Sequence, residues 1–167
     1  VNEEDEYRDT VDLIWFPTGG GKTEAYLGVM AFLFVYRRLK YPHSSGGTVT
    51  IMRYTLRLLT SQQFLRAAKV VFSLELLRRR NTKLLGVEPF SLGLWVGAGS
   101  TPNTLKKAHE NITDGQFTKL GITACPWCDN PFNTSNYIFG TNSFHFECHH
   151  PKCDFGGSEY KKFPCNT

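Results

Sequence analysis

The chain has 167 residues, 41% of them hydrophobic and 20% charged, which is the composition of a globular protein and excludes a disordered one. Its formal net charge of +4 permits a polyanionic partner without requiring one. No apolar run is long enough to span a membrane, and the acidic N-terminus lacks the apolar core of a signal peptide, so we expect a cytoplasmic protein without membrane contact.

The first predicted elements are a buried strand at residues 12–16 and a helix at residues 22–39, joined by a glycine-rich turn. The turn ends in three glycines followed by Lys22 and Thr23. A strand, a glycine turn and Gly-Lys-Thr opening a helix form the layout of a phosphate-binding P-loop. The glycines let successive backbone N–H groups converge on one point, where the helix N-terminus adds partial positive charge.

This turn predicts ATP and Mg²⁺ as cofactors. Lys22 would reach the β- and γ-phosphates, and Thr23 would place its hydroxyl on Mg²⁺, so both are candidate catalytic residues. The strict pattern has glycine where this chain has Phe16, which leaves open a glycine-rich turn with an incidental lysine. The full set of candidate cofactor-binding residues is Thr18, Gly19, Gly20, Gly21, Lys22, Thr23 and Glu24.

The remaining elements continue the alternation of strand and helix. We predict strands at residues 48–54 and 90–96, a long helix at residues 58–79 and a short helix at residues 104–110 capped by Asn103 or Thr104. The helix at residues 22–39 is apolar almost all round, which indicates burial under a sheet. This order predicts an α/β fold with a parallel sheet and helices on both faces. The turns after the three strands should then line one edge of the sheet.

From residue 115 onward the chain is poor in aliphatic residues and holds all five of its cysteines, four of them in two pairs. Cys125 and Cys128 form a CxxC knuckle, and Cys148 and Cys153 form a second pair after 19 intervening residues. This spacing predicts a tetrahedral Zn²⁺ site of four thiolates, which leaves no open position and is therefore structural. A nucleotide motif beside an odd number of cysteines favours a reducing compartment and a metal over disulfides.

Other assignments of this region remain open. A histidine (His145, His149 or His150) could replace one cysteine, or the four cysteines could be ordinary buried residues. Cys165 is predicted to be a free buried thiol. Aromatic residues that alternate in part predict a small β-ribbon: Phe132, Tyr137, Phe139, Phe144 and Phe146. We therefore divide the chain into residues 1–114, the start of an α/β domain, and residues 115–167, a zinc-ribbon-like insert.

Taken together, these motifs resemble the first RecA-like motor domain of superfamily-2 helicases. Residues 16–23 resemble motif I, and residues 54–63 resemble motif Ia through Arg57, Leu59 and Gln63. Residues 99–102 resemble the Gly-Asp-Thr-Pro turn of a helicase subgroup, with Ser100 in place of the acid. The cysteine-rich insert after that turn is similar to the helicase subunit of DISARM-type phage-defence systems. The resemblance extends over residues 11–165.

The resemblance implies an ATP-driven motor on nucleic acid, on DNA rather than RNA. Arg57, Gln63, Gly99 and Thr101 would contact the nucleic-acid backbone without reading sequence. The alternative for Arg57 is a solvated arginine at a helix start, and residues 78–80 are predicted to be only a basic helix end that complements the helix dipole. The implied partners are the remainder of the parent helicase chain and other subunits of the defence system.

A motor also needs an Asp-Glu pair at the end of an apolar strand and a second RecA-like lobe, and neither is found in this sequence. We therefore expect a piece of a longer enzyme that is inactive alone. Two other functions fit the motifs. One is a P-loop nucleotide kinase with a zinc-bearing lid. The other is a non-catalytic nucleotide-binding module whose zinc region docks a protein partner.

Overall fold

The computed structural model describes residues 4, 6–7, 9–11, 13, 15, 21–54, 57–97, 101–141, 144–156 and 165–166, with the backbone alone at 57–61, 117–118 and 165–166. The helices are α1 (Lys22–Lys40), α2 (Arg57–Arg80), α3 (Thr82–Leu85) and α4 (Leu105–Thr113), with short 3-10 turns at Phe117–Leu120 and Thr134–Asn136. The strands are β1 (Leu92–Gly93), β2 (Tyr137–Phe139), β3 (Phe144–Phe146) and β4 (Cys165–Asn166).

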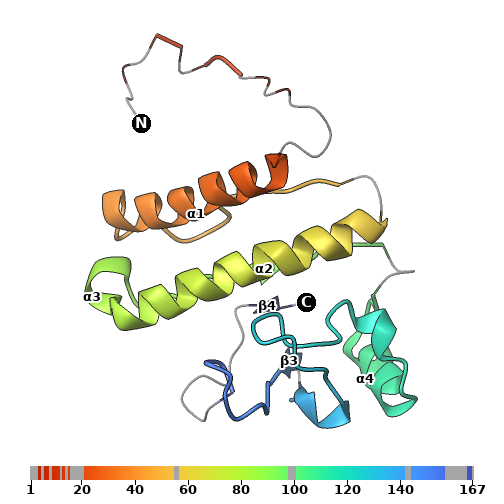
Figure 1. Cartoon of the computed structure of the whole chain (residues 1–167). Helices are drawn as coiled ribbons and strands as arrows, with labels where there is room; N and C mark the ends of the chain where they lie inside the picture. Colours follow the sequence, from red (N-terminus) through yellow and green to blue (C-terminus); the bar gives the residue numbers. More distant parts are fainter. Residues whose placement is uncertain are drawn as a thin grey trace.

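Helix α2 lies between α1 and the cysteine-rich region and contributes to a hydrophobic core on each side (Figure 1). Facing α1, it presents Ala67, Val71 and Leu74, which pack around residues of α1 and Phe90. Facing the cysteines, it presents Phe64, Ala68 and Phe72. Each set repeats at intervals of three or four residues, so one helix carries two apolar stripes. The cysteine-rich region therefore shares its core with α2.

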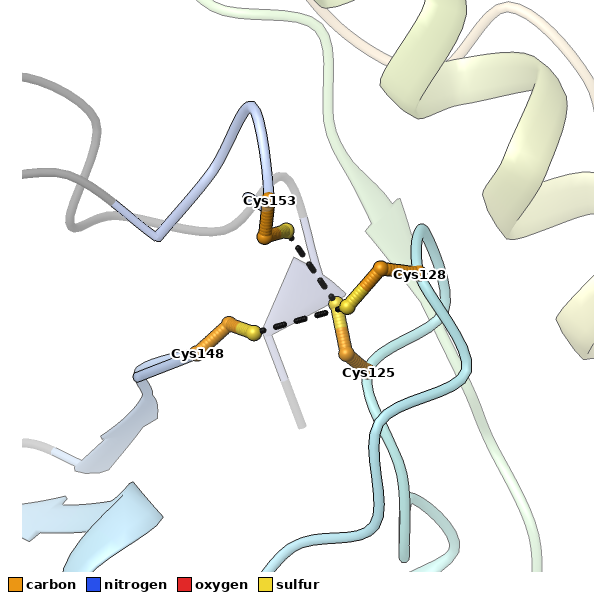
Figure 2. Close-up of side chains that lie close together, drawn as sticks. All are labelled: Cys125, Cys128, Cys148 and Cys153. Carbon is orange, nitrogen blue, oxygen red and sulfur yellow. Dashed lines mark hydrogen bonds between the residues drawn. The ribbon is translucent and has the colours of Figure 1, made fainter. Parts of the chain in front are cut away.

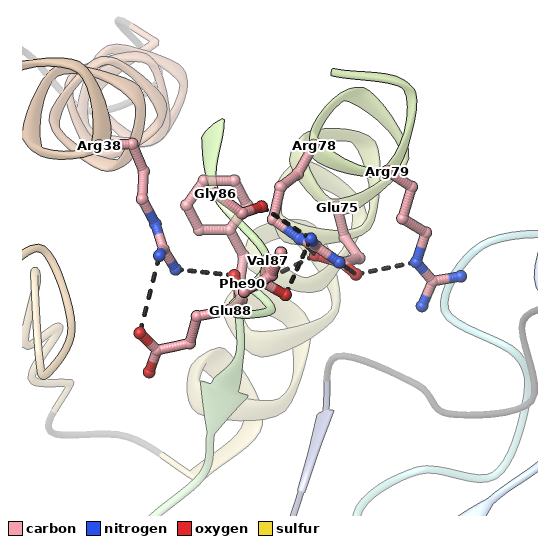
Figure 3. A network of polar contacts seen from close by, with 8 residues as sticks. All are labelled: Arg38, Glu75, Arg78, Arg79, Gly86, Val87, Glu88 and Phe90. Atoms are coloured by element: carbon pink, nitrogen blue, oxygen red, sulfur yellow. Dashed lines mark hydrogen bonds and ion pairs between the residues drawn. The ribbon is translucent and has the colours of Figure 1, made fainter. Parts of the chain in front are cut away.

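A buried carboxylate joins the second half of α2 to the chain that follows it (Figure 3). Glu75 accepts hydrogen bonds from Nε and Nη2 of Arg78 at 2.8 and 2.7 Å and from Nε of Arg79 at 2.8 Å. It also accepts one from the backbone N–H of Phe90 at 3.1 Å. Burial raises the pKa of the Glu75 carboxyl, but these hydrogen bonds outweigh burial, so the pKa is lowered and the group is ionised.

Two arginines extend these contacts to the segment between α3 and β1. Arg78 donates from Nη1 to the carbonyls of Gly86 and Val87, each at 3.0 Å. Arg38 of α1 donates to the carbonyl of Glu88 at 2.9 Å (Figure 3). The prediction that residues 78–80 are only a basic helix end is therefore wrong for Arg78, which is a buried ion-pair partner.

The helix predictions are confirmed to within a few residues. Helices α1 and α2 begin and end within one residue of the expected positions, and Thr104 caps α4 by accepting a hydrogen bond from the N–H of Lys107 at 3.2 Å. Only one face of α1 is buried in the part of the chain that the structure describes, however, and several of its apolar residues are exposed instead of covered by a sheet: Tyr26, Val29, Phe32 and Leu39. In the part of the chain that the structure describes, no helix has both the length and the apolarity to cross a bilayer.

The strand predictions are confirmed only in part. The antiparallel ribbon is confirmed by β2 and β3, in which Ile138 pairs with His145. The parallel sheet of several strands is not present among the described residues, where parallel pairing joins β1 to β4 alone. Residues 48–54 form no ladder, and Val11, Leu13 and Trp15 lie in no strand and are 91%, 92% and 81% exposed. A strand requires a neighbour for its backbone groups, and no pairing of these segments is found among the described residues.

Candidate metal centre

The four cysteine thiols converge on one point from two separate turns (Figure 2). All four sulfur atoms lie within 4.8 Å of one another, with Sγ of Cys125 3.8 Å from Cys153 and Sγ of Cys128 3.7 Å from Cys148. A tetrahedron with Zn–S bonds of about 2.3 Å has edges of about 3.8 Å. The cluster predicted from the cysteine spacing is therefore confirmed, and its size and soft ligands suit a metal ion such as Zn²⁺.

The first knuckle is a tight hairpin. Ala124 and Pro131 form an isolated antiparallel bridge at its base. Within it, the N–H of Cys125 donates to the carbonyl of Asn130, and the N–H of Asp129 donates back to the carbonyl of Cys125, each at 2.9 Å. Asp129 takes a left-handed conformation with φ of 59°, which is tolerated by aspartate. This turn points the thiols at positions 125 and 128 in the same direction.

The second knuckle follows β3. The N–H of Cys153 donates to the carbonyl of His150 at 3.0 Å, and the N–H of Gly156 donates to the carbonyl of Cys153 at 2.8 Å. A Cβ atom on Gly156 would lie 2.4 Å from the His150 carbonyl oxygen, so only glycine fits there. The β2–β3 hairpin brings Cys148 to this turn and completes the cluster.

Burial favours the neutral form of two of the four thiols, Cys125 and Cys153. Burial raises the pKa of Cys125 far above its ordinary value and that of Cys153 to about 12. Burial also opposes ionisation of Cys128, but a hydrogen bond from the backbone of Asn130 and contacts with the other thiols lower its pKa. Thiolates this close to one another repel, so the cluster ionises fully only beside a compensating positive charge, which a divalent metal supplies.

The histidines do not join the cluster. Nε2 of His145 and Nε2 of His149 lie 3.4 and 3.6 Å from the carboxylate of Glu147. Within the described residues, the group that can hold a metal contains cysteines only. The structure thus supports four thiolates over a mixed histidine and cysteine site.

Phe155 attaches the cysteine centre to α2, a contact that sequence reasoning missed. Its ring packs edge-on against Phe72 at 4.5 Å and Trp127 at 5.7 Å, and the guanidinium of Arg79 lies 5.2 Å from its centroid. Nε1 of Trp127 donates to Asp154 at 2.8 Å, which ties the two knuckles together. Phe155, two residues after Cys153, therefore lies in the hydrophobic core that α2 shares with the metal centre.

The candidate phosphate-binding turn is described only at its end. Gly21 caps α1 with φ of 73°, a left-handed conformation that glycine adopts freely, and Lys22 opens the helix. Thr23 is half-buried, and Glu24 forms an ion pair with Arg66. The binding of ATP and Mg²⁺ stays a prediction. Three of its candidate residues lie outside the described residues: Thr18, Gly19 and Gly20.

The candidate nucleic-acid residues are not brought together by the described part of the structure. The side chain of Arg57 and all of Gly99 lie outside the described residues. The side-chain oxygen of Gln63 is buried without a hydrogen-bond partner, in a groove rather than on an open surface. Thr101 is half-buried, with Cγ2 3.6 Å from where a Cβ on Gly121 would lie. Nucleic-acid binding therefore stays a prediction as well.

No protein-family model matches the chain. The chain is 49% identical over 135 residues to the DISARM protein DrmA of Bacillus paralicheniformis, an alignment that covers 72% of this chain and 12% of that relative. The chain thus spans about an eighth of the relative's length. The similarity agrees with the DISARM-type resemblance found in the cysteine-rich insert.

Proposed function

We propose that this chain is the ATP-binding part of a helicase or translocase that acts on nucleic acid, on DNA rather than RNA, in phage defence. The observation that carries the proposal is the similarity to the DISARM protein DrmA over 72% of the chain. The motifs of the chain resemble the helicase subunit of that class of defence system. The left-handed Gly21 directly before Lys22, at the first turn of α1, supports the ATP part, because a phosphate cradle needs both features there.

In this proposal three parts of the chain have different tasks. Lys22 and Thr23 hold the triphosphate and its Mg²⁺, and the turn at Thr101 with the start of α2 holds the nucleic-acid backbone. The four cysteines hold Zn²⁺ with no position open to substrate, so the metal stabilises the fold and takes no part in the reaction. The remainder of a longer protein and other subunits of the defence system would supply the missing carboxylates and second lobe.

A nucleotide-binding assay tests the ATP part. We expect a fluorescent ATP analogue to bind weakly with Mg²⁺, and Lys22→Ala to weaken binding at least about tenfold, or about 1.4 kcal/mol. Lys83→Ala, which removes an exposed lysine of α3, is the matched control and should leave binding unchanged. Equal binding by the Lys22→Ala and unaltered chains would contradict the proposal. ATP turnover by this chain, abolished by Lys22→Ala, would contradict our expectation that it is inactive alone.

Metal analysis tests the structural centre. Protein purified in reducing buffer should contain one zinc ion per chain, and Cys148→Ser should lose it, because a serine hydroxyl is a poor ligand for this metal. Absence of zinc from the unaltered chain would contradict the proposal that the four cysteines hold Zn²⁺. If Cys148→Ser retained zinc in full, the metal would have to be held by a set of ligands other than the four thiolates.

A further inference from the structure

The four cysteines of the metal centre differ in their access to solvent. Three of them are buried in the core that α2 shares with the centre: Cys125 (0% exposed), Cys148 (2%) and Cys153 (6%). Cys128 is only half-buried and packs against the edge of that core. The residue after it, Asp129, is exposed and forms an ion pair with Lys69 of α2 at 2.9 Å. A small molecule from solvent therefore reaches Cys128 before the other three.

Each sulfur atom also has a near neighbour on the opposite knuckle (Figure 2). Sγ of Cys128 lies 3.7 Å from Sγ of Cys148, and Sγ of Cys125 lies 3.8 Å from Sγ of Cys153. A disulfide bond joins its two sulfur atoms at about 2.05 Å, so either pair forms one when its sulfur atoms approach by less than about 2 Å. Disulfides along these two pairs connect the first knuckle to the second, which is the connection that a metal bound by all four cysteines also makes.

We propose that Cys128 is a site of oxidation by hydroperoxides, and that Cys148 is the cysteine that converts the oxidised form into a disulfide. A thiol that binds a divalent metal is deprotonated, and the thiolate is the form that acts as a nucleophile. All four sulfur atoms are therefore nucleophiles in the metal-bound chain, while burial shields three of them. The inference rests on the proposed zinc centre and does not depend on the binding of ATP or nucleic acid.

The reaction consumes two thiolates and one hydroperoxide. The Cys128 thiolate attacks the peroxide oxygen that carries the hydrogen, the O–O bond breaks, and a sulfenic acid forms on Cys128 while the other oxygen leaves as an alcohol or as water. The Cys148 thiolate then attacks the sulfur of that sulfenic acid, so that the S–S bond forms, the S–O bond breaks and the oxygen leaves as water. The two sulfur atoms lose two electrons to the peroxide, and solvent supplies two protons. The two remaining thiolates are too few for a closed four-ligand site, so the metal ion is released.

The pairing across the two knuckles has a consequence for the fold. Phe155 packs on Phe72 of α2 and follows the second knuckle, which contains Cys148. A bond between Cys128 and Cys148 holds the knuckles together after the metal has left, so the ring of Phe155 stays in the core beside α2. The reduced chain has no such bond when a chelator removes its metal. Oxidation therefore exchanges a metal crosslink for a covalent one at the same place in the fold.

The test uses the zinc-loaded 167-residue chain with Cys165→Ser, which removes the cysteine that is not among the four of the cluster. Hydrogen peroxide is added, zinc release is followed with a chromophoric chelator, and free thiols are blocked with N-ethylmaleimide before peptide mapping. We expect zinc to leave as a disulfide forms between Cys128 and Cys148. Without peroxide, limited alkylation of the same zinc-loaded chain should modify Cys128 at least about tenfold faster than the three buried cysteines. The unaltered chain is the matched control and should form the same disulfide.

Hydrogen exchange then compares the two metal-free forms. The oxidised chain should keep its α2 amides at least about tenfold more protected than the reduced chain treated with a chelator, and a reductant added with zinc should restore the metal. In a chain that binds zinc, the inference is overturned by a first disulfide inside one knuckle, by faster alkylation of a buried cysteine than of Cys128, or by equal exchange of α2 in the two forms. Zinc and thiols that survive a large excess of peroxide would overturn it as well. A chain that never binds zinc fails the metal analysis instead, and contradicts the proposed centre.

Discussion

Replacing Glu75 by alanine should destabilise the fold strongly. Glu75 is 1% exposed, and its carboxylate accepts hydrogen bonds from Arg78, Arg79 and the N–H of Phe90. Alanine leaves the guanidinium of Arg78, itself 6% exposed, with backbone carbonyls but no counter-charge. Breaking a buried pair in this way costs about 3–5 kcal/mol. With a urea m-value of about 2 kcal/mol per molar, the unfolding midpoint should fall by about 1.5–2.5 M.

Urea titration followed by far-ultraviolet circular dichroism, at a fixed zinc concentration, measures this effect. The control is Glu110→Ala, which removes an exposed ion pair with Lys107 at the same spacing of three residues and should leave the midpoint nearly unchanged. A double variant, Glu75→Leu with Arg78→Met, should recover much of the loss, since apolar residues of similar size can replace a buried ion pair. Equal midpoints for Glu75→Ala and Glu110→Ala would refute the reasoning.

The remaining predictions concern the metal centre. Phe155→Ala should lower the free energy of unfolding by about 3–5 kcal/mol while one zinc ion per chain remains, and Phe155→Leu should cost less; urea titration with metal analysis checks both. Zinc affinity, measured by competition with a chromophoric chelator, should rise between about pH 6 and 8, because burial raises the pKa of Cys125 and Cys153 and their protons must leave before zinc binds. A flat profile would contradict that account. Chelation should also speed amide exchange in α2, and unchanged exchange there would show that the metal stabilises only its own loops.

The elements that the sequence predicts best are those whose stability is local. Helix α1 follows from its apolar spacing and its glycine cap, and α4 follows from Thr104 as its cap, because these signals act within a few residues. The cysteine cluster is similar: two short knuckles need only meet once for four thiols to converge. The predicted sheet depends instead on pairing between distant segments. Residues 90–97 show the expected alternation of burial, but the alternation does not specify a neighbour.

The buried charges show a different limit of sequence reasoning. Glu75 is the one acidic residue within α2, and arginines follow it three and four residues later, so the sequence contains the helical spacing of an ion pair. The same spacing is common on exposed helix surfaces, where it contributes little. What makes Glu75 important is that both faces of α2 are covered, one by α1 and the other by the cysteine-rich region. That coverage depends on tertiary packing and could not be predicted from the spacing.

The position of Phe155 gives the metal centre a role beyond its own loops. Its ring contacts Arg79, which pairs with Glu75, and Glu75 in turn accepts the N–H of Phe90. The ring of Phe90 packs edge-on against Phe34 of α1 at 5.2 Å. An unbroken series of contacts therefore leads from the second cysteine knuckle, across α2, to the helix that begins at the candidate phosphate-binding turn. A metal that only closed a surface loop would need no such contacts, whereas a metal that fixes the packing of α2 requires them.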